Sequence, residues 1–169
     1  MLSVLAALET ELPKLLQDES QWQGLYVDYH PPVVERLWRQ WGKYRVSLHR
    51  IHPCGEGEAL FHPHPWPQAV RVLSGIMYEM GIGYGKGDTP PPIVSKSIVE
   101  VSLGGYIYEM THPDGWHYVR PIGNASMSLM VSGIPWDRSS PRSEKPLRAL
   151  AAAERKRIFG FFRTRYPVR

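Results

Sequence analysis

Two histidines separated by a single residue are the most chemically suggestive feature of the sequence. They begin the segment H-P-H-P-W-P-Q-A-V-R-V-L-S-G, which runs from His62 to Gly75. Alternate side chains of a β-strand point to the same face, so His62 and His64 would lie about 7 Å apart and could share one divalent cation. The intervening prolines remove backbone donors, which places the pair at a rim or an edge rather than in a central strand. Spacing alone leaves open a loop that contains histidines and binds nothing.

The overall composition indicates one globular domain that is rich in turns. The chain has 169 residues, of which 43% are hydrophobic, and this is enough to bury a core. Sixteen prolines and fifteen glycines favour a β-rich or mixed fold over a helical bundle. The single cysteine, Cys54, excludes an internal disulfide, so we expect a reducing, cytoplasmic location. No apolar run approaches about 18 residues, and we expect no membrane span.

Charge is distributed unevenly along the chain. Residues 1–137 hold ten Lys or Arg against fourteen Asp or Glu, whereas residues 138–169 hold ten Lys or Arg against two Glu. The acidic body and the basic C-terminal part are complementary, which predicts a homodimer and equally fits a solvated helix that offsets the body's charge. Aromatic residues are not interleaved with the basic ones, so we do not expect nucleic acid as a partner.

Hydrophobic periodicity divides the chain into a helical start, a β-rich middle and a helical end. Helical spacing of apolar residues predicts helices at residues 2–12, 32–41 and 143–165. We therefore expect a single domain, 1–169, made of a helical extension (1–43), a β-barrel or jelly roll (44–136) and a basic C-terminal helix (137–169). Alternation predicts strands at residues 44–51, 70–73, 76–80, 93–101, 106–110, 116–120 and 127–132, with a weaker strand at 25–29 and a long loop at 81–92.

The histidine segment resembles the first sequence motif of the cupin superfamily. The spacing His62-x-His64-x3-Gln68-x6-Gly75 matches that motif at all four places, with glutamine where cupins carry glutamate. About forty residues later, Pro113-Asp-Gly115-Trp-His117 resembles the second motif, shortened by one residue. The resemblance covers roughly residues 44–136. It implies a cupin β-barrel in which His62, His64 and His117 bind a divalent metal ion.

Within cupins the chain looks most like the thiol dioxygenases of the cysteine dioxygenase type. The segments G-E-G at 55–57, V-R-V-L-S-G at 70–75 and M-S-L-M-V-S-G-I-P-W-D at 127–137 carry this resemblance. It implies iron held by three histidines without a carboxylate. The family's last strand carries Ser-x-His-x-Tyr, whereas this chain has Ser128-x-Met130-x-Ser132, so thiol oxidation itself does not follow.

Several neighbours of the histidines are candidates for catalysis or substrate binding. Gln68 could bind the metal, donate to a metal-bound group or be a vestige of the cupin glutamate. Arg71 could clamp a carboxylate if a bulge turned it inward. Trp66 and Tyr118 could line the mouth of the barrel or belong to an aromatic core. We expect His49 and His52 in solvent, and we prefer His117 to His112 as the third ligand because P-x-G precedes it.

Two functional hypotheses follow. Three neutral imidazoles leave a divalent ion with its full charge, which favours an anionic substrate in a poorly solvated barrel. The first hypothesis is therefore a mononuclear non-haem Fe(II) oxygenase that acts on a small anionic metabolite. Zinc, nickel, manganese and copper bind similar ligands, so the sequence does not name the metal. The alternative is a non-catalytic cupin that serves as a small-molecule-binding or protein-interaction domain.

Overall fold

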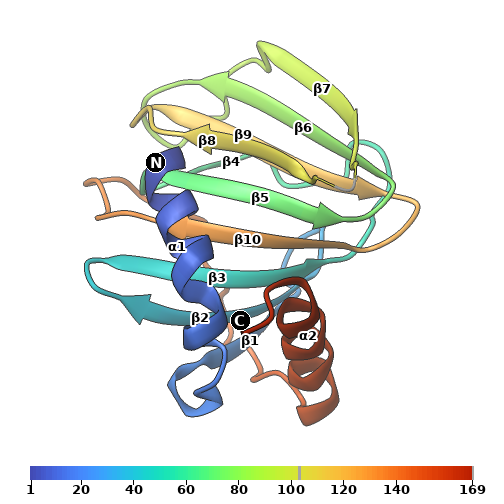
Figure 1. The fold of residues 1–169 in the computed structure, drawn as a ribbon. Helices are drawn as coiled ribbons and strands as arrows, with labels where there is room; N and C mark the ends of the chain where they lie inside the picture. Colours follow the sequence, from blue (N-terminus) through green and yellow to red (C-terminus); the bar gives the residue numbers. More distant parts are fainter. Residues whose placement is uncertain (103, 169) are drawn as a thin grey trace.

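The chain forms two antiparallel β-sheets that face each other, with two α-helices outside them (Figure 1). A computed structural model describes residues 1–102 and 104–168, and the counts below refer to these residues. The six-stranded sheet has the order β1 (Gln23–Val27), β2 (Val34–Trp41), β3 (Tyr44–Ile51), β10 (Ser126–Ser132), β5 (Gln68–Ser74) and β8 (Tyr106–Met110). The four-stranded sheet has the order β4 (His62–Pro63), β9 (Gly115–Ile122), β6 (Met77–Tyr84) and β7 (Ser95–Glu100).

The helices cover the outer face of the six-stranded sheet and leave its inner face free. The helix α1 (Leu2–Leu15) buries Leu5, Leu8 and Leu12, and α2 (Ala152–Arg165) buries Phe159 and Phe162. They form one hydrophobic cluster with residues of β2, β3 and β10. Strand side chains alternate between the two faces, so the other half of each strand points between the sheets. That inner space contains the candidate site.

The prediction of a mainly β fold with helices before and after the strands is confirmed. The strands Tyr44–Ile51 and Tyr106–Met110 have the predicted bounds. The strand β6 runs to Tyr84 and so takes up the first part of the predicted loop at 81–92. In the C-terminal part, α2 begins only at Ala152, because residues 143–151 run without helical structure across one side of the inner space. Among the described residues, neither α-helix combines the length and apolar character that a membrane span requires.

The predicted helix at residues 32–41 is wrong, because Val34–Trp41 forms strand β2. One face of this strand packs against the helices and the other points into the cavity between the sheets. Its apolar residues therefore do not alternate cleanly with polar ones. A turn at Gly42 and Lys43 then leads directly into β3, with Trp41 paired to Tyr44. Gly42 has a φ of 56°, as the first central position of a type II′ hairpin turn requires. The helical extension therefore shrinks to α1 and a 3₁₀ turn at Glu19–Gln21, and the β-structure begins at Gln23.

Part of the positive charge of the C-terminal helix is paired with acidic side chains of the same chain. Arg157 approaches Glu35 of β2, and Arg163 forms an ion pair with Glu19 at 2.7 Å. Glu35 is buried and also pairs with Arg50 at 2.6 Å. These contacts fit the interpretation that the helix offsets the acidic body of its own chain, and the homodimer stays a prediction.

Candidate metal centre

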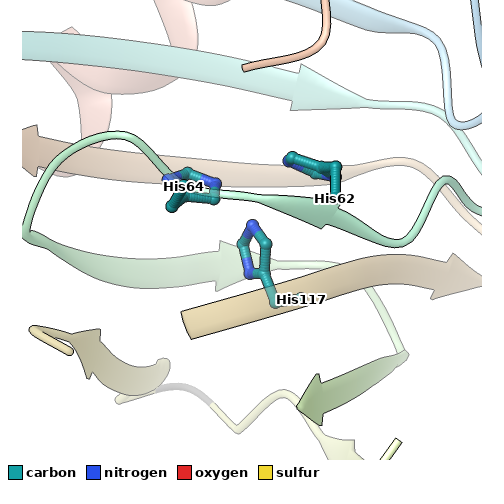
Figure 2. A group of neighbouring side chains, drawn as sticks. All are labelled: His62, His64 and His117. Carbon is teal, nitrogen blue, oxygen red and sulfur yellow. The ribbon is translucent and has the colours of Figure 1, made fainter. Parts of the chain in front are cut away.

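The structure brings the three predicted histidines together between the sheets. His62 lies on β4 directly opposite His117 of β9, and His64 follows one residue after β4 ends. One nitrogen from each ring lies within 4.8 Å of the others, as metal ligands require. The ring centroids are 5.2 Å apart for His62 and His64, and 4.2 Å apart for His64 and His117. Figure 2 shows the His117 ring reaching toward the space between the other two.

Short strand pairing and one hydrogen bond hold this arrangement in place. Only two residue pairs join β4 to β9, and the second is Pro63 with Trp116, where proline has no N–H to donate. Nδ1 of His62 donates to the carbonyl oxygen of Leu60 at 2.8 Å. This bond fixes the tautomer and leaves Nε2 as the free lone pair, which is the usual arrangement of a metal-binding histidine.

The electrostatics of the three rings fit a metal ion. Burial lowers the pKa of His62 to about 4, with smaller contributions from His30 and Arg36. Burial and the neighbouring histidines also hold the pKa values of His64 and His117 well below their usual range. All three are therefore neutral at pH 7 and offer lone pairs. In the described part of the chain, Nδ1 of His64 and Nδ1 of His117 are buried without a hydrogen-bond partner. Neutral imidazoles suit iron, zinc, copper and nickel, so the residues fit the predicted divalent ion.

Two of the other predicted site residues lie in the same cavity. Gln68 begins β5 and is fully buried, and its Oε1 has no hydrogen-bond partner among the described residues. Its Nε2 points to the sulfur of Met110 at 3.8 Å. Trp66 also lines the cavity, and its ring lies 5.9 Å from that of His64. Both residues are in a position to contact a bound ligand.

Arg71 and Tyr118 are not brought to the cavity. Arg71 points to the helix side, where its Nη2 donates to Glu9 of α1 at 2.8 Å. The hydroxyl of Tyr118 donates to Glu79 at 2.7 Å, and neither residue lines the cavity. The strand β5 pairs regularly with β8 from Gln68 to Val72, and the irregularity in its pairing with β10 lies after Val72, so the side chain of Arg71 keeps its outward direction.

Of the four remaining histidines, His30 and His49 line the cavity, whereas His52 and His112 lie outside it. His49 was expected in solvent but is buried and lines the cavity, because its strand is covered on both faces. His52 contacts Glu35 at 2.9 Å and lies outside the cavity. His112 accepts a hydrogen bond from the backbone of Asp114 and does not join the cluster of three, so the preference for His117 is consistent with the geometry.

Sequence reasoning missed Arg36, a buried cation that points into the cavity. It points inward from β2, and its Nε donates to Nε2 of His49 at 3.0 Å. Within residues 1–102 and 104–168, no carboxylate forms an ion pair with Arg36, and burial lowers its pKa. The reading of residues 32–41 as a helix hid this orientation. The hairpin signal at Gly42 would have shown that Arg36 lies opposite His49 in a strand pair.

The cavity that contains these groups has a volume of about 430 Å³. Of the described residues that line it, none is Asp or Glu. Arg36, His49 and Ser128 lie side by side on the neighbouring strands β2, β3 and β10. Arg142 and Lys145 also line the cavity, along its open side. A cavity with cations and no carboxylates attracts anions.

Comparisons with known proteins concern the fold. No protein-family model matches the sequence, and a comparison with curated proteins finds no match. Among solved structures, hydroxypropylphosphonic acid epoxidase from S. wedmorenis is 16% identical, with a TM-score of 0.50 over 69% of this chain and 57% of the epoxidase. Fe(II) HppE gives 13% identity and a TM-score of 0.51 over 69% of this chain and 58% of its own. A cupin-2 domain protein from Rhodospirillum rubrum is 16% identical, with a TM-score of 0.48 over 73% of this chain and 76% of its own.

The chain shares its fold with the epoxidase, and its two antiparallel sheets with outer helices fit the predicted β-rich cupin fold. At these identities the likeness extends to the fold alone, and this chain spans less than two thirds of the epoxidase. The cluster of three histidines lies at β4, at the residue after it and at β9, as the two sequence motifs predicted. The narrower resemblance to thiol dioxygenases stays a prediction.

Proposed function

We propose that this chain is a metal-dependent cupin enzyme, a mononuclear non-haem Fe(II) oxygenase that acts on a small anionic metabolite. The observation that carries the proposal is the cluster of His62, His64 and His117 in a cavity that also holds the cation of Arg36. A metal centre and a substrate anchor in one cavity are the minimum that such an enzyme needs.

The roles follow from the chemistry of the side chains. The three neutral imidazoles would hold the metal, and bound Fe(II) would supply redox chemistry with O₂ as the oxidant. The guanidinium of Arg36 would orient an anionic substrate group, because a planar fork of donors matches a carboxylate. His49 is a neutral acceptor for Arg36, so it orients the guanidinium without cancelling its charge.

Gln68 would position the substrate. Its buried Oε1 has no hydrogen-bond partner in the described residues, and an N–H or O–H of a bound ligand would satisfy it. The amide replaces the glutamate of the first cupin motif, so the site keeps one negative charge fewer and has a greater preference for anions.

The test is an anaerobic titration with Fe(II), followed by oxygen uptake with a panel of thiols, diketones and hydroxy acids. We expect one iron per chain and substrate-dependent oxygen uptake that is lost in His117→Ala. Metal binding without oxygen uptake for any of the panel would favour the alternative, a non-catalytic small-molecule-binding cupin. The replacement of the family's His and Tyr by Met130 and Ser132 in the last strand is the observation that favours this alternative.

A further inference from the structure

A second polar group lies inside the cavity, away from the cations. Tyr78 of β6 and Tyr108 of β8 both line the cavity. Tyr78 is 1% exposed, and its hydroxyl lies next to that of Tyr108, to which it donates a hydrogen bond. Burial and the neighbouring Tyr108 raise the pKa of Tyr78 well above 10, so it is a neutral phenol at pH 7. One hydrogen bond between two buried phenols leaves the second O–H donor and the lone pairs of the Tyr78 oxygen free for a ligand.

Apolar side chains separate this phenol from the charged wall. Val70, Met130 and Val119 line the cavity, and the first two form a hydrophobic cluster with Tyr78. This middle part of the cavity offers apolar contacts and few hydrogen bonds. It fits the carbon skeleton of a ligand better than it fits water.

The two polar ends are too far apart to bind the same chemical group. Arg36 lies on β2 and Tyr108 on β8, with β3, β10 and β5 between them in the sheet. Four strand spacings correspond to about 19 Å along the backbone of the curved sheet, and the side chains of Arg36 and Tyr108 both extend into the cavity and shorten this distance. A cavity of about 430 Å³ holds roughly fourteen non-hydrogen atoms, if each takes about the 30 Å³ of a liquid water molecule.

We infer that the ligand of this cavity is a carboxylic acid with an apolar, aromatic-sized body and a hydroxyl group at its far end, which the hydroxyl of Tyr78 recognises. The inference rests on the proposed function in one respect, namely that the carboxylate lies at Arg36. It names the substrate class of that site. The Tyr78 contact is a specificity determinant and adds nothing to metal binding.

The test uses zinc-loaded protein, which does not react with O₂, and isothermal titration with acetate, phenylacetate and 4-hydroxyphenylacetate. We expect phenylacetate to bind more tightly than acetate, and the 4-hydroxyl group to strengthen binding by about fivefold, the value of one hydrogen bond. Tyr78→Phe removes only the hydroxyl oxygen and should abolish the fivefold preference while phenylacetate binds as before. Tyr84→Phe, at an exposed tyrosine outside the cavity, is the matched control and should keep the preference.

Three results would overturn the inference: no binding of either aromatic acid, no preference for the hydroxylated acid, or a preference that persists in Tyr78→Phe. Thermal unfolding of each variant checks that the fold is intact. Iron titration and oxygen uptake are separate measurements, so a failed ligand preference and a failed metal site are distinguishable.

Discussion

Replacing Arg36 by methionine should weaken anion binding and leave the fold intact. Methionine keeps most of the length of the side chain and removes the charge and the donors. A hydrogen bond to a charged group contributes about 1.5–3 kcal/mol, which corresponds to a loss of about 10- to 150-fold in affinity for a carboxylate. For stability, two effects oppose each other. Removing a buried cation without a carboxylate partner stabilises by about 1 kcal/mol or more, whereas His49 loses its donor, which costs about the same. The unfolding midpoint should therefore shift by less than about 4 °C.

The assay is isothermal titration of the zinc-loaded protein with phenylacetate and with its neutral counterpart, phenylacetamide. The variant should lose affinity for the acid and bind the amide within about twofold of wild type. Arg71→Met is the control, because Arg71 pairs with Glu9 on the helix side and should leave both affinities unchanged. Equal losses for acid and amide in Arg36→Met, or a larger loss in Arg71→Met, would refute the assignment of Arg36 as the anion anchor.

Three further predictions concern stability, turnover and assembly. Metal-free protein should lose about 3 kcal/mol of unfolding free energy through His62 alone as the pH falls from 6.5 to 4, because the unfolded state takes up a proton that the folded state, with a pKa of about 4, does not. Urea unfolding at a series of pH values tests this, and His62→Asn should make the pH dependence shallower, with the remaining slope due to His64 and His117. Gln68→Ala should leave metal affinity within about threefold of wild type and lower oxygen uptake at least tenfold, which elemental analysis and an oxygen electrode measure together; an equal loss of metal would contradict it. Sedimentation at micromolar concentration should show a homodimer in low and moderate salt, and a monomer in both would contradict it.

The metal cluster could be predicted from sequence because its determinants are local. His62 and His64 lie two residues apart in one short segment, and the resemblance of Pro113 to His117 to the second cupin motif indicates the third ligand. The pairing of β4 with β9, which brings His62 opposite His117, could not be predicted from the spacing of residues along the sequence. The cluster itself agrees with the prediction.

Arg36, the proposed anion anchor, could not be predicted because the residues around it do not alternate as the residues of a β-strand usually do. In β2, Glu35 and Leu37 are buried under the helices while Arg36 enters the cavity, so charged residues lie on both faces of a strand. Such a strand has no clean alternation, and residues 32–41 match helical spacing by chance. Arg71 would reach the cavity only if a bulge turned it inward, and the regular pairing of β5 from Gln68 to Val72 leaves it on the opposite face from Gln68.

Metal content measured by equilibrium dialysis and elemental analysis tests the central claim most directly. Wild type and His112→Ala should each bind one divalent ion per chain, and His62→Ala, His64→Ala and His117→Ala should each lose affinity by at least 100-fold. The account is contradicted if wild type stays empty with iron, zinc, nickel and manganese in turn, or if His112→Ala loses the metal while His117→Ala retains it.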